Sequence, residues 1–107
     1  MIRVSISRNS RGQIYGFTAR NHGKSIVCAA VSALIINAVN SIEAFTEEAM
    51  SVDMPKNDTG YIKLLLPAIE AGEGGKDAGL LLSSMLLGLH HIREQYPSQV
   101  AIEDPNF

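Results

Sequence analysis

The chain begins with two stretches in which apolar side chains occupy every second position, Ile2–Ile6 and Tyr15–Ala19. Successive side chains of a β-strand point to opposite faces of a sheet, so this period of two predicts two half-buried strands. The segment between them, Arg8–Gly12, is rich in residues that favour turns. We therefore expect the two strands to form a hairpin.

The pattern changes at Ser25, after which almost every residue up to Phe45 is apolar or small. This run predicts a long helix, and Ser25 is a suitable N-cap because its hydroxyl can accept a hydrogen bond from an amide of the first turn. A helix without a polar face is normally covered on most sides. We expect this helix to be buried on most sides, with an exposed edge that begins near Asn37, Asn40 and Glu43.

A similar set of elements follows. Alternation returns at Met50–Met54, and Gly60–Leu66 has the pattern of a second strand. Apolar residues then recur at helical spacing over Asp77–Tyr96, and Pro97 ends this helix. Val100–Ile102 is long enough for one last short strand.

These elements predict an α+β fold with two layers, in which two long helices pack on one mostly antiparallel sheet. The length of 107 residues is typical of one domain, so we expect a single domain over residues 1–107.

The charge and the cysteine content limit which classes of function and which cellular compartment are expected for this protein. The net charge is −2 without a basic stripe, so direct nucleic-acid binding is not expected, since it depends on Lys and Arg neutralising phosphates. A single cysteine cannot form an intrachain disulfide, which favours a reducing compartment. The apolar block Ile26–Val39 contains Ser32 and Asn37 and is shorter than the ~20 residues of a membrane span. We expect a cytoplasmic protein that does not contact a membrane.

The only cysteine, Cys28, falls in the first turn of the first predicted helix, six residues after His22. A thiolate there faces the positive end of the helix dipole, and a neighbouring imidazole can serve as its base. The spacing alone leaves two interpretations, a Cys/His dyad or a small core residue with a histidine nearby. Ser32 lies one turn after Cys28 on the same face, where its hydroxyl can support the thiol or bond back to a helix carbonyl.

For the other polar residues that stand out in the sequence, a structural role is expected and not a functional one. His90 and His91 are adjacent, and adjacent helical side chains point ~100° apart, so we expect no shared metal ion. Gly72–Gly75 resembles a phosphate loop only in glycine content, because it lacks the Lys-Ser/Thr ending, and a flexible connection is expected. Carboxylates at the end of the first helix are expected to be solvated, namely Glu43, Glu47 and Glu48.

The run Ile26–Leu34, IVCAAVSAL, resembles the signature of the ribosomal-processing cysteine proteases, a bacterial family. The layout around it is also similar. Met1–Val4 begins an N-terminal hairpin, Gly60–Lys63 forms a later strand, and Leu86–Gly88 lies in a second helix. The resemblance therefore covers nearly the whole chain.

The resemblance implies a small α+β domain that forms homodimers and acts as a cysteine endopeptidase without a metal or cofactor. Cys28 matches the family nucleophile and His22 the family base, with Ser25 and Ser32 as supporting candidates. The implied partner is a large-subunit ribosomal protein precursor, whose N-terminal extension is removed after an aromatic-rich stretch.

The chain departs from the family pattern around the histidine. Members usually have Gly-His-Ala, a longer loop, and an aspartate before Ile-Val-Cys, whereas this chain has Asn21, His22 and Gly23, a shorter loop, and Ser25. Either His22 is the family base with the loop shortened behind it, or the base is absent. The distance from the N-terminus favours the first alignment, and the shorter loop and the missing aspartate predict reduced or no activity. The second alignment implies a non-catalytic dimeric peptide-binding or ribosome-assembly protein with a disabled dyad.

Overall fold

The computed structural model describes residues 1–21, 25–57 and 60–106. In this part of the chain the elements are, in order, β1 (Ile2–Arg8), β2 (Ile14–Arg20), α1 (Ser25–Phe45), β3 (Ser51–Asp53), β4 (Tyr61–Leu65), α2 (Pro67–Glu70), α3 (Lys76–Gln95) and β5 (Val100–Glu103). Each predicted strand and helix is confirmed. The short helix α2 has no counterpart in the prediction, because a single turn is too short to show a helical period, although Pro67 suits its start.

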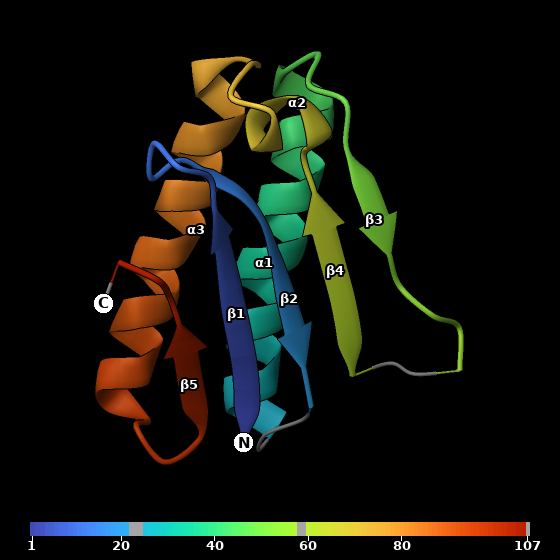
Figure 1. Cartoon of the computed structure of the whole chain (residues 1–107). Helices are drawn as coiled ribbons and strands as arrows, with labels where there is room; N and C mark the ends of the chain where they lie inside the picture. Colours follow the sequence, from blue (N-terminus) through green and yellow to red (C-terminus); the bar gives the residue numbers. More distant parts are fainter. Residues whose placement is uncertain (22–24, 58–59, 107) are drawn as a thin grey trace.

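The strands form one sheet in the order β3-β4-β2-β1-β5 (Figure 1). β1 and β2 make the predicted antiparallel hairpin, in which Arg3 lies opposite Arg20. β4 pairs antiparallel with both β2 and β3, and only β5 lies parallel to its neighbour, β1. The mostly antiparallel sheet is therefore confirmed.

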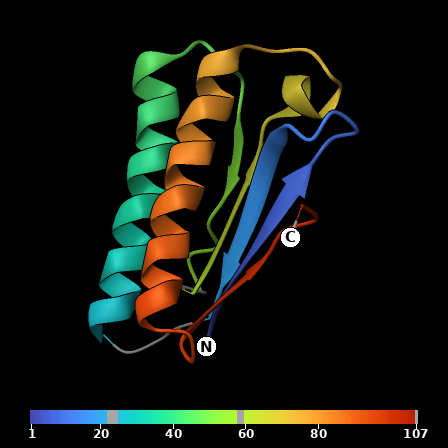
Figure 2. The same ribbon diagram turned by 90° about the vertical axis from the view of Figure 1, so that its left-hand side faces the viewer.

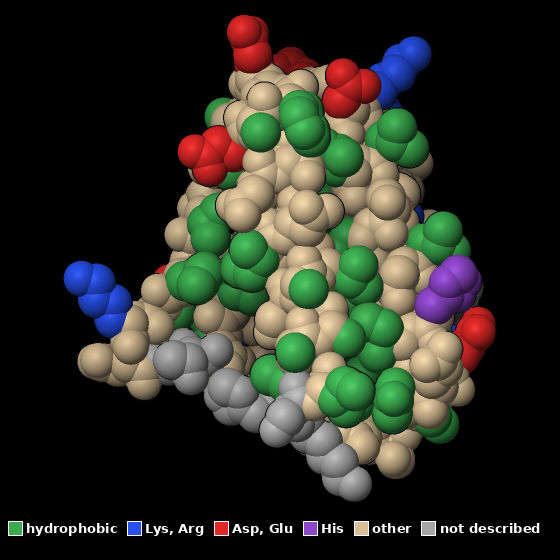
Figure 3. Space-filling view, turned by 180° about the vertical axis from the view of Figure 1, so that it is seen from behind, with side chains coloured by type: hydrophobic (Ala, Val, Ile, Leu, Met, Phe, Trp, Pro, Cys, Tyr) green, Lys and Arg blue, Asp and Glu red, His purple; other side chains and the backbone are tan. Residues whose placement is uncertain are grey.

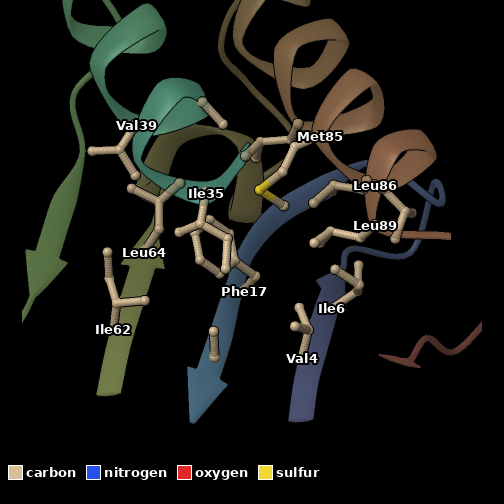
Figure 4. Packing of buried hydrophobic residues seen from close by; sticks show 14 of the residues in the cluster. Val4, Ile6, Phe17, Ile35, Val39, Ile62, Leu64, Met85, Leu86 and Leu89 are labelled. Carbon is tan, nitrogen blue, oxygen red and sulfur yellow. The ribbon is translucent and has the colours of Figure 1, made fainter. Parts of the chain in front are cut away.

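α1 and α3 lie side by side on one face of the sheet, and the other face is left open (Figure 2). Apolar side chains from the covered face and from both helices form one core (Figure 4). Phe17 of β2 is 1% exposed and points from the sheet toward Ile35 of α1. This arrangement confirms the two-layer α+β fold.

The expectation that α1 is buried on most sides is wrong. One stripe of the helix faces the core, made of Val27, Val31, Ile35, Ala38, Val39 and Ile42. On other sides the helix meets solvent, so that Ile26 is 70% exposed and Ile36 is 39% exposed. Figure 3 shows apolar side chains spread across the outer face of the helical layer. The reason is the architecture, because a helix in a two-layer fold has no third layer to cover its outer face.

The length argument against a membrane span is also wrong. Ile26–Phe45 of α1 has the length and apolar composition of a span, with a mean hydropathy of 1.8. The core helix of a soluble protein can have the same length and composition, although such a helix is mostly buried, whereas 33% of this segment is buried inside the protein. The buried stripe of α1 belongs to the core, so length and composition are weak indications of a membrane role here.

The glycine-rich connection Gly72–Gly75 leads from α2 to α3. Gly72 and Gly74 have φ angles of 84° and 97°, a region that glycine adopts without steric cost. The amide of Gly75 donates a hydrogen bond to Glu48 Oε1 at 2.8 Å. Glu48 is half-buried as a residue and its hydrogen bond to Gly75 is exposed, so its carboxylate has a protein partner as well as access to solvent. It lies beside the first turn of α3, where the helix dipole favours a negative charge.

One buried ion pair ties the C-terminal segment to the hairpin. Nε and Nη2 of Arg8 donate hydrogen bonds to Oδ1 and Oδ2 of Asp104 at 2.7 and 2.8 Å. The amide of Asn106 also donates to Asp104 Oδ1, at 3.1 Å, and Arg8 Nη1 donates to the carbonyl of Gly12 at 2.8 Å. The Asp104 side chain is 0% exposed, and these hydrogen bonds offset the cost of removing its charge from water.

Candidate active site

A cavity of about 200 Å³ lies between the first half of α1 and the sheet, where β2 ends and β4 begins. Its wall is mostly apolar and includes Ile36 of α1, Met54 after β3, and Tyr61 of β4. Met54 is 58% exposed, so apolar surface continues from the cavity to the outside of the protein. A cavity with apolar walls and a few polar groups is the usual form of a small binding site.

Cys28 lines this cavity from the first turn of α1. Its side chain is half-buried and packs against the edge of the core. It is therefore neither sealed among aliphatic side chains nor fully solvated. The start of a helix presents main-chain amides and the positive end of the helix dipole, so this position suits a group that carries negative charge.

Ser32 lines the same cavity, one helical turn after Cys28. The spacing of four residues places the two side chains on one face of the helix, as expected from the sequence. Ser32 is exposed, so a bound molecule can reach its hydroxyl. The structure thus brings together two of the four residues that the sequence singles out.

The other two, His22 and the side chain of Ser25, lie outside the described residues, so the dyad and the N-cap stay predictions. The described chain on either side of them is informative. Asn21 lines the cavity together with Cys28, and its amide donates a hydrogen bond to the carbonyl of Gly60 at 2.8 Å. The chain therefore leaves β2 at the rim of the cavity and re-enters the described structure at the start of α1.

Sequence reasoning missed the residues that shape the cavity wall, above all Ile36, Met54 and Asn21. For Met54 a signal exists, since it is a large apolar residue between a short strand and a proline. Ile36 is hidden in an apolar run, where no local pattern separates core residues from cavity residues. Asn21 offers a different signal, because asparagine before His22 and Gly23 at the end of a strand is typical of a sharp turn.

Among the described residues, no group of three His, Cys, Asp or Glu side chains is placed to hold a metal ion. His90 is half-buried, and it lies close enough to Asp104 for its charge to act on that carboxylate. His90 therefore acts on the ion pair of the C-terminal segment, and neither His90 nor His91 lines the cavity.

The model of a protein family, described as cysteine protease Prp, matches residues 1–101. The chain belongs to this family. The resemblance seen at Ile26–Leu34 is thereby confirmed, and the cavity beside Cys28 is the candidate active site of a Prp-type cysteine protease.

Two named Prp relatives show the extent of the similarity. The ribosomal processing cysteine protease Prp of Staphylococcus aureus is 28% identical over 108 residues, which cover 95% of this chain and 97% of that protein. The protein of the same name from Bacillus subtilis is 27% identical, with 95% of this chain and 96% of that protein covered.

Solved structures agree with the sequence comparison. The crystal structure of the essential ribosomal processing protease Prp from S. aureus, with a covalently linked product peptide, matches with a TM-score of 0.88 and 28% identity. That match covers 97% of this chain and 99% of the other. SMU.848 from Streptococcus mutans matches with a TM-score of 0.80 and 30% identity, covering 97% of this chain and 93% of that one.

Proposed function

We propose that this chain is a cysteine endopeptidase that removes the N-terminal extension of a large-subunit ribosomal protein. The observation that carries the proposal is the position of Cys28, half-buried on an apolar cavity in the first turn of α1. The names of the S. aureus and B. subtilis relatives support the ribosomal substrate. The proposal treats residues 1–107 as one protease domain that works in the bacterial cytoplasm, without direct contact to nucleic acid or to a membrane.

The proposed mechanism follows from the chemistry of a thiol beside an imidazole. His22 takes the proton of Cys28, and the thiolate attacks the scissile carbonyl. Main-chain amides at the start of α1 stabilise the oxyanion of the tetrahedral intermediate. His22 then gives its proton to the leaving amine, and water hydrolyses the acyl-enzyme, releasing the second product and restoring the thiol. Neither a metal nor a cofactor takes part.

The apolar wall of the cavity suits an apolar side chain of the substrate, next to the scissile bond. Ile36, Met54 and Tyr61 offer aliphatic, thioether and aromatic surface within reach of Cys28. Burying an apolar side chain there gains ~25 cal/mol for each Å² removed from water, which holds the peptide while the thiol reacts. Ser32, exposed on the same wall, is a candidate hydrogen-bonding group for the peptide main chain.

The proposed function is tested with a peptide that carries the N-terminal extension of the host's ribosomal protein. Mass spectrometry should show one cut by the wild type and none by Cys28→Ala. His22→Ala should lower the rate by about a hundredfold or more, the usual contribution of a general base. Absence of cleavage by the wild type would contradict the proposal.

Alkylation by iodoacetamide serves as the control that does not depend on the peptide. A dyad predicts that Cys28 reacts well below pH 8 and that the rate falls in His22→Ala. A thiol that reacts only after denaturation would favour the alternative, a non-catalytic peptide-binding protein.

We also propose that two copies of the chain associate through the outer face of the helical layer. Large apolar side chains are exposed on both helices, among them Ile26, Leu80 and Leu87, and Figure 3 shows apolar side chains across the outer face of the helical layer. Between Ser25 and Ile42 the sequence has no Asp, Glu, Lys or Arg. The centres of protein interfaces are depleted in charge in the same way, and monomers rarely expose large apolar patches.

A further inference from the structure

Arg20 carries a charge beside the candidate active site. Among the described residues that line the cavity, it is the only lysine, arginine, aspartate or glutamate. It is the last residue of β2, and it is exposed to solvent. In a mostly apolar site a few polar groups decide which ligand is preferred, so a charge in this place can select between peptides.

The neighbouring strand β4 helps to fix the position of the Arg20 side chain. Arg20 lies opposite Tyr61 in the pairing of β2 with β4, and its Cζ lies over the Tyr61 ring, 5.8 Å from the ring centre. Tyr61 is half-buried and lines the same cavity. A ring in this position restrains the arginine but offers no oxygen acceptor to its N–H donors, which remain available to a ligand.

The described part of the chain does not neutralise the charge of Arg20. Its two ion pairs join Arg3 to Glu103 and Arg8 to Asp104, so no described carboxylate pairs with Arg20. The residue directly opposite Arg20 on β1 is Arg3, a second cation. Like charges directly opposite each other on a sheet repel, so a negative group beside Arg20 would relieve an unfavourable contact as well as form a favourable one.

The alternation of the strands decides where such a group would lie. Ala19 and Ile62 belong to the core and are 6% and 9% exposed, so their neighbours Arg20 and Tyr61 are on the open side of the sheet. β2 ends at Arg20 and β4 begins at Tyr61, so this pair stands at the rim of the cavity. Adjacent residues of an extended peptide point to opposite sides, so a peptide with one side chain in the cavity can direct a neighbouring side chain to the rim.

We propose that Arg20 is a specificity-determining residue that binds an acidic side chain of the substrate, close to the apolar residue in the cavity. This inference rests on the proposed peptidase function and names the class of peptide, an apolar residue with aspartate or glutamate close to it in sequence. A guanidinium and a carboxylate can form two parallel hydrogen bonds, whereas a lysine at the same place is repelled. Arg20 takes no part in bond breaking and decides only which peptide is held.

A charge-reversal experiment tests the inference. In variants of the extension peptide, each residue near the scissile bond is replaced in turn by Glu, Gln or Lys. For each enzyme, kcat/KM with the Glu and Lys peptides is divided by the value for the Gln peptide, so that a general change in activity cancels. At one position the wild type should prefer Glu to Lys by about fivefold or more, mainly through KM, as expected for an exposed charge pair. Arg20→Glu should reverse this preference.

Arg3→Gln is the matched control, because it removes a charge from the neighbouring strand at a residue that does not line the cavity. It should keep the preference for Glu. Fluorescence anisotropy with Cys28→Ala, alone and combined with Arg20→Glu, measures the same preference in binding without cleavage.

The inference and the proposed function fail in different ways. Equal cleavage of the Glu and Lys peptides at every position would overturn the inference alone. So would a preference that Arg20→Glu leaves unchanged, or one that Arg3→Gln abolishes. Absence of cleavage with every peptide would overturn the proposed function, and the binding measurement would then still decide whether Arg20 selects an acidic peptide.

Discussion

At the scale of single residues, Asp104 shows how the fold tolerates a buried charge. The hydrogen bond from Arg8 holds the pKa of Asp104 below its ordinary value, while burial acts in the opposite direction. The amide of Asn106 and the charges of Arg8 and His90 lower this pKa further. The same hydrogen bond raises the pKa of the Arg8 guanidinium, so both groups are charged at neutral pH.

This ion pair predicts a stability effect that depends on pH. Because the pKa of Asp104 is lower in the folded than in the unfolded state, its contribution is present above the unfolded value and is lost as pH falls through the folded value. Asp104→Asn should lower the free energy of unfolding by about 2–3 kcal/mol at pH 7, since it leaves Arg8 without its anionic partner. Urea denaturation at pH 7 and pH 3 measures the difference, which should shrink at pH 3. An equal difference at both values would contradict this account.

At the scale of elements, Gly16 and Gly79 differ in the space around them, and only Gly16 lies where two elements approach closely. A Cβ on Gly16 of β2 would lie 2.3 Å from the main-chain oxygen of Leu64 in β4. Neither atom belongs to a flexible side chain, so the two strands would have to move apart. A Cβ on Gly79 of α3 meets no atom within 4 Å.

Substitution of the two glycines by alanine is expected to change the stability of the protein in opposite directions. Gly16→Ala should destabilise the protein by about 1–3 kcal/mol, the usual cost of forcing extra atoms into a packed site. Gly79→Ala should stabilise it by about 0.5–1 kcal/mol, because alanine loses less main-chain freedom in a helix. The denaturant concentration at the midpoint of unfolding, measured for both variants, tests these two expectations. A shift of both midpoints in the same direction would contradict them.

At the scale of the whole molecule, the two faces of the two-layer fold differ in character. The outer helical face is apolar and almost without charge over α1 (Figure 3). The open face of the sheet is polar, since Arg3, Thr18 and Lys63 alternate with buried neighbours on their strands. Because of this asymmetry, we propose that two copies associate through their helices and not through the open face of the sheet.

The proposed dimer makes a prediction about charge. Leu87 is 60% exposed on α3, and Leu87→Glu should weaken association by about tenfold or more, since an interface with an unpaired carboxylate at its centre is costly. Thr18→Glu adds the same charge to the open face of the sheet and should leave association unchanged. Sedimentation velocity over a concentration series gives the dissociation constants. A wild type that is monomeric throughout, or that instead binds lipid vesicles, would rule out the dimer.

Much of the fold and part of the site follow from the sequence. The alternation at Ile2–Ile6 arises from the geometry of a strand, and it identifies both the strand and its buried face. The apolar run after Ser25 predicts α1 and places Cys28 in its first turn. These features depend on neighbouring residues only. The signature at Ile26–Leu34 is likewise a local run of residues, so the family can be recognised from the sequence alone.

By itself, then, the sequence determined the elements, their order, the location of the thiol and the family. Only the tertiary structure decided that α1 keeps its outer face exposed, that Glu48 binds the start of α3, and that a cavity lined by Arg20 opens beside Cys28. The physical reason is that these features depend on atoms far apart along the chain. Arg8 and Asp104 are 96 residues apart and yet share two hydrogen bonds, and no local period encodes such a contact.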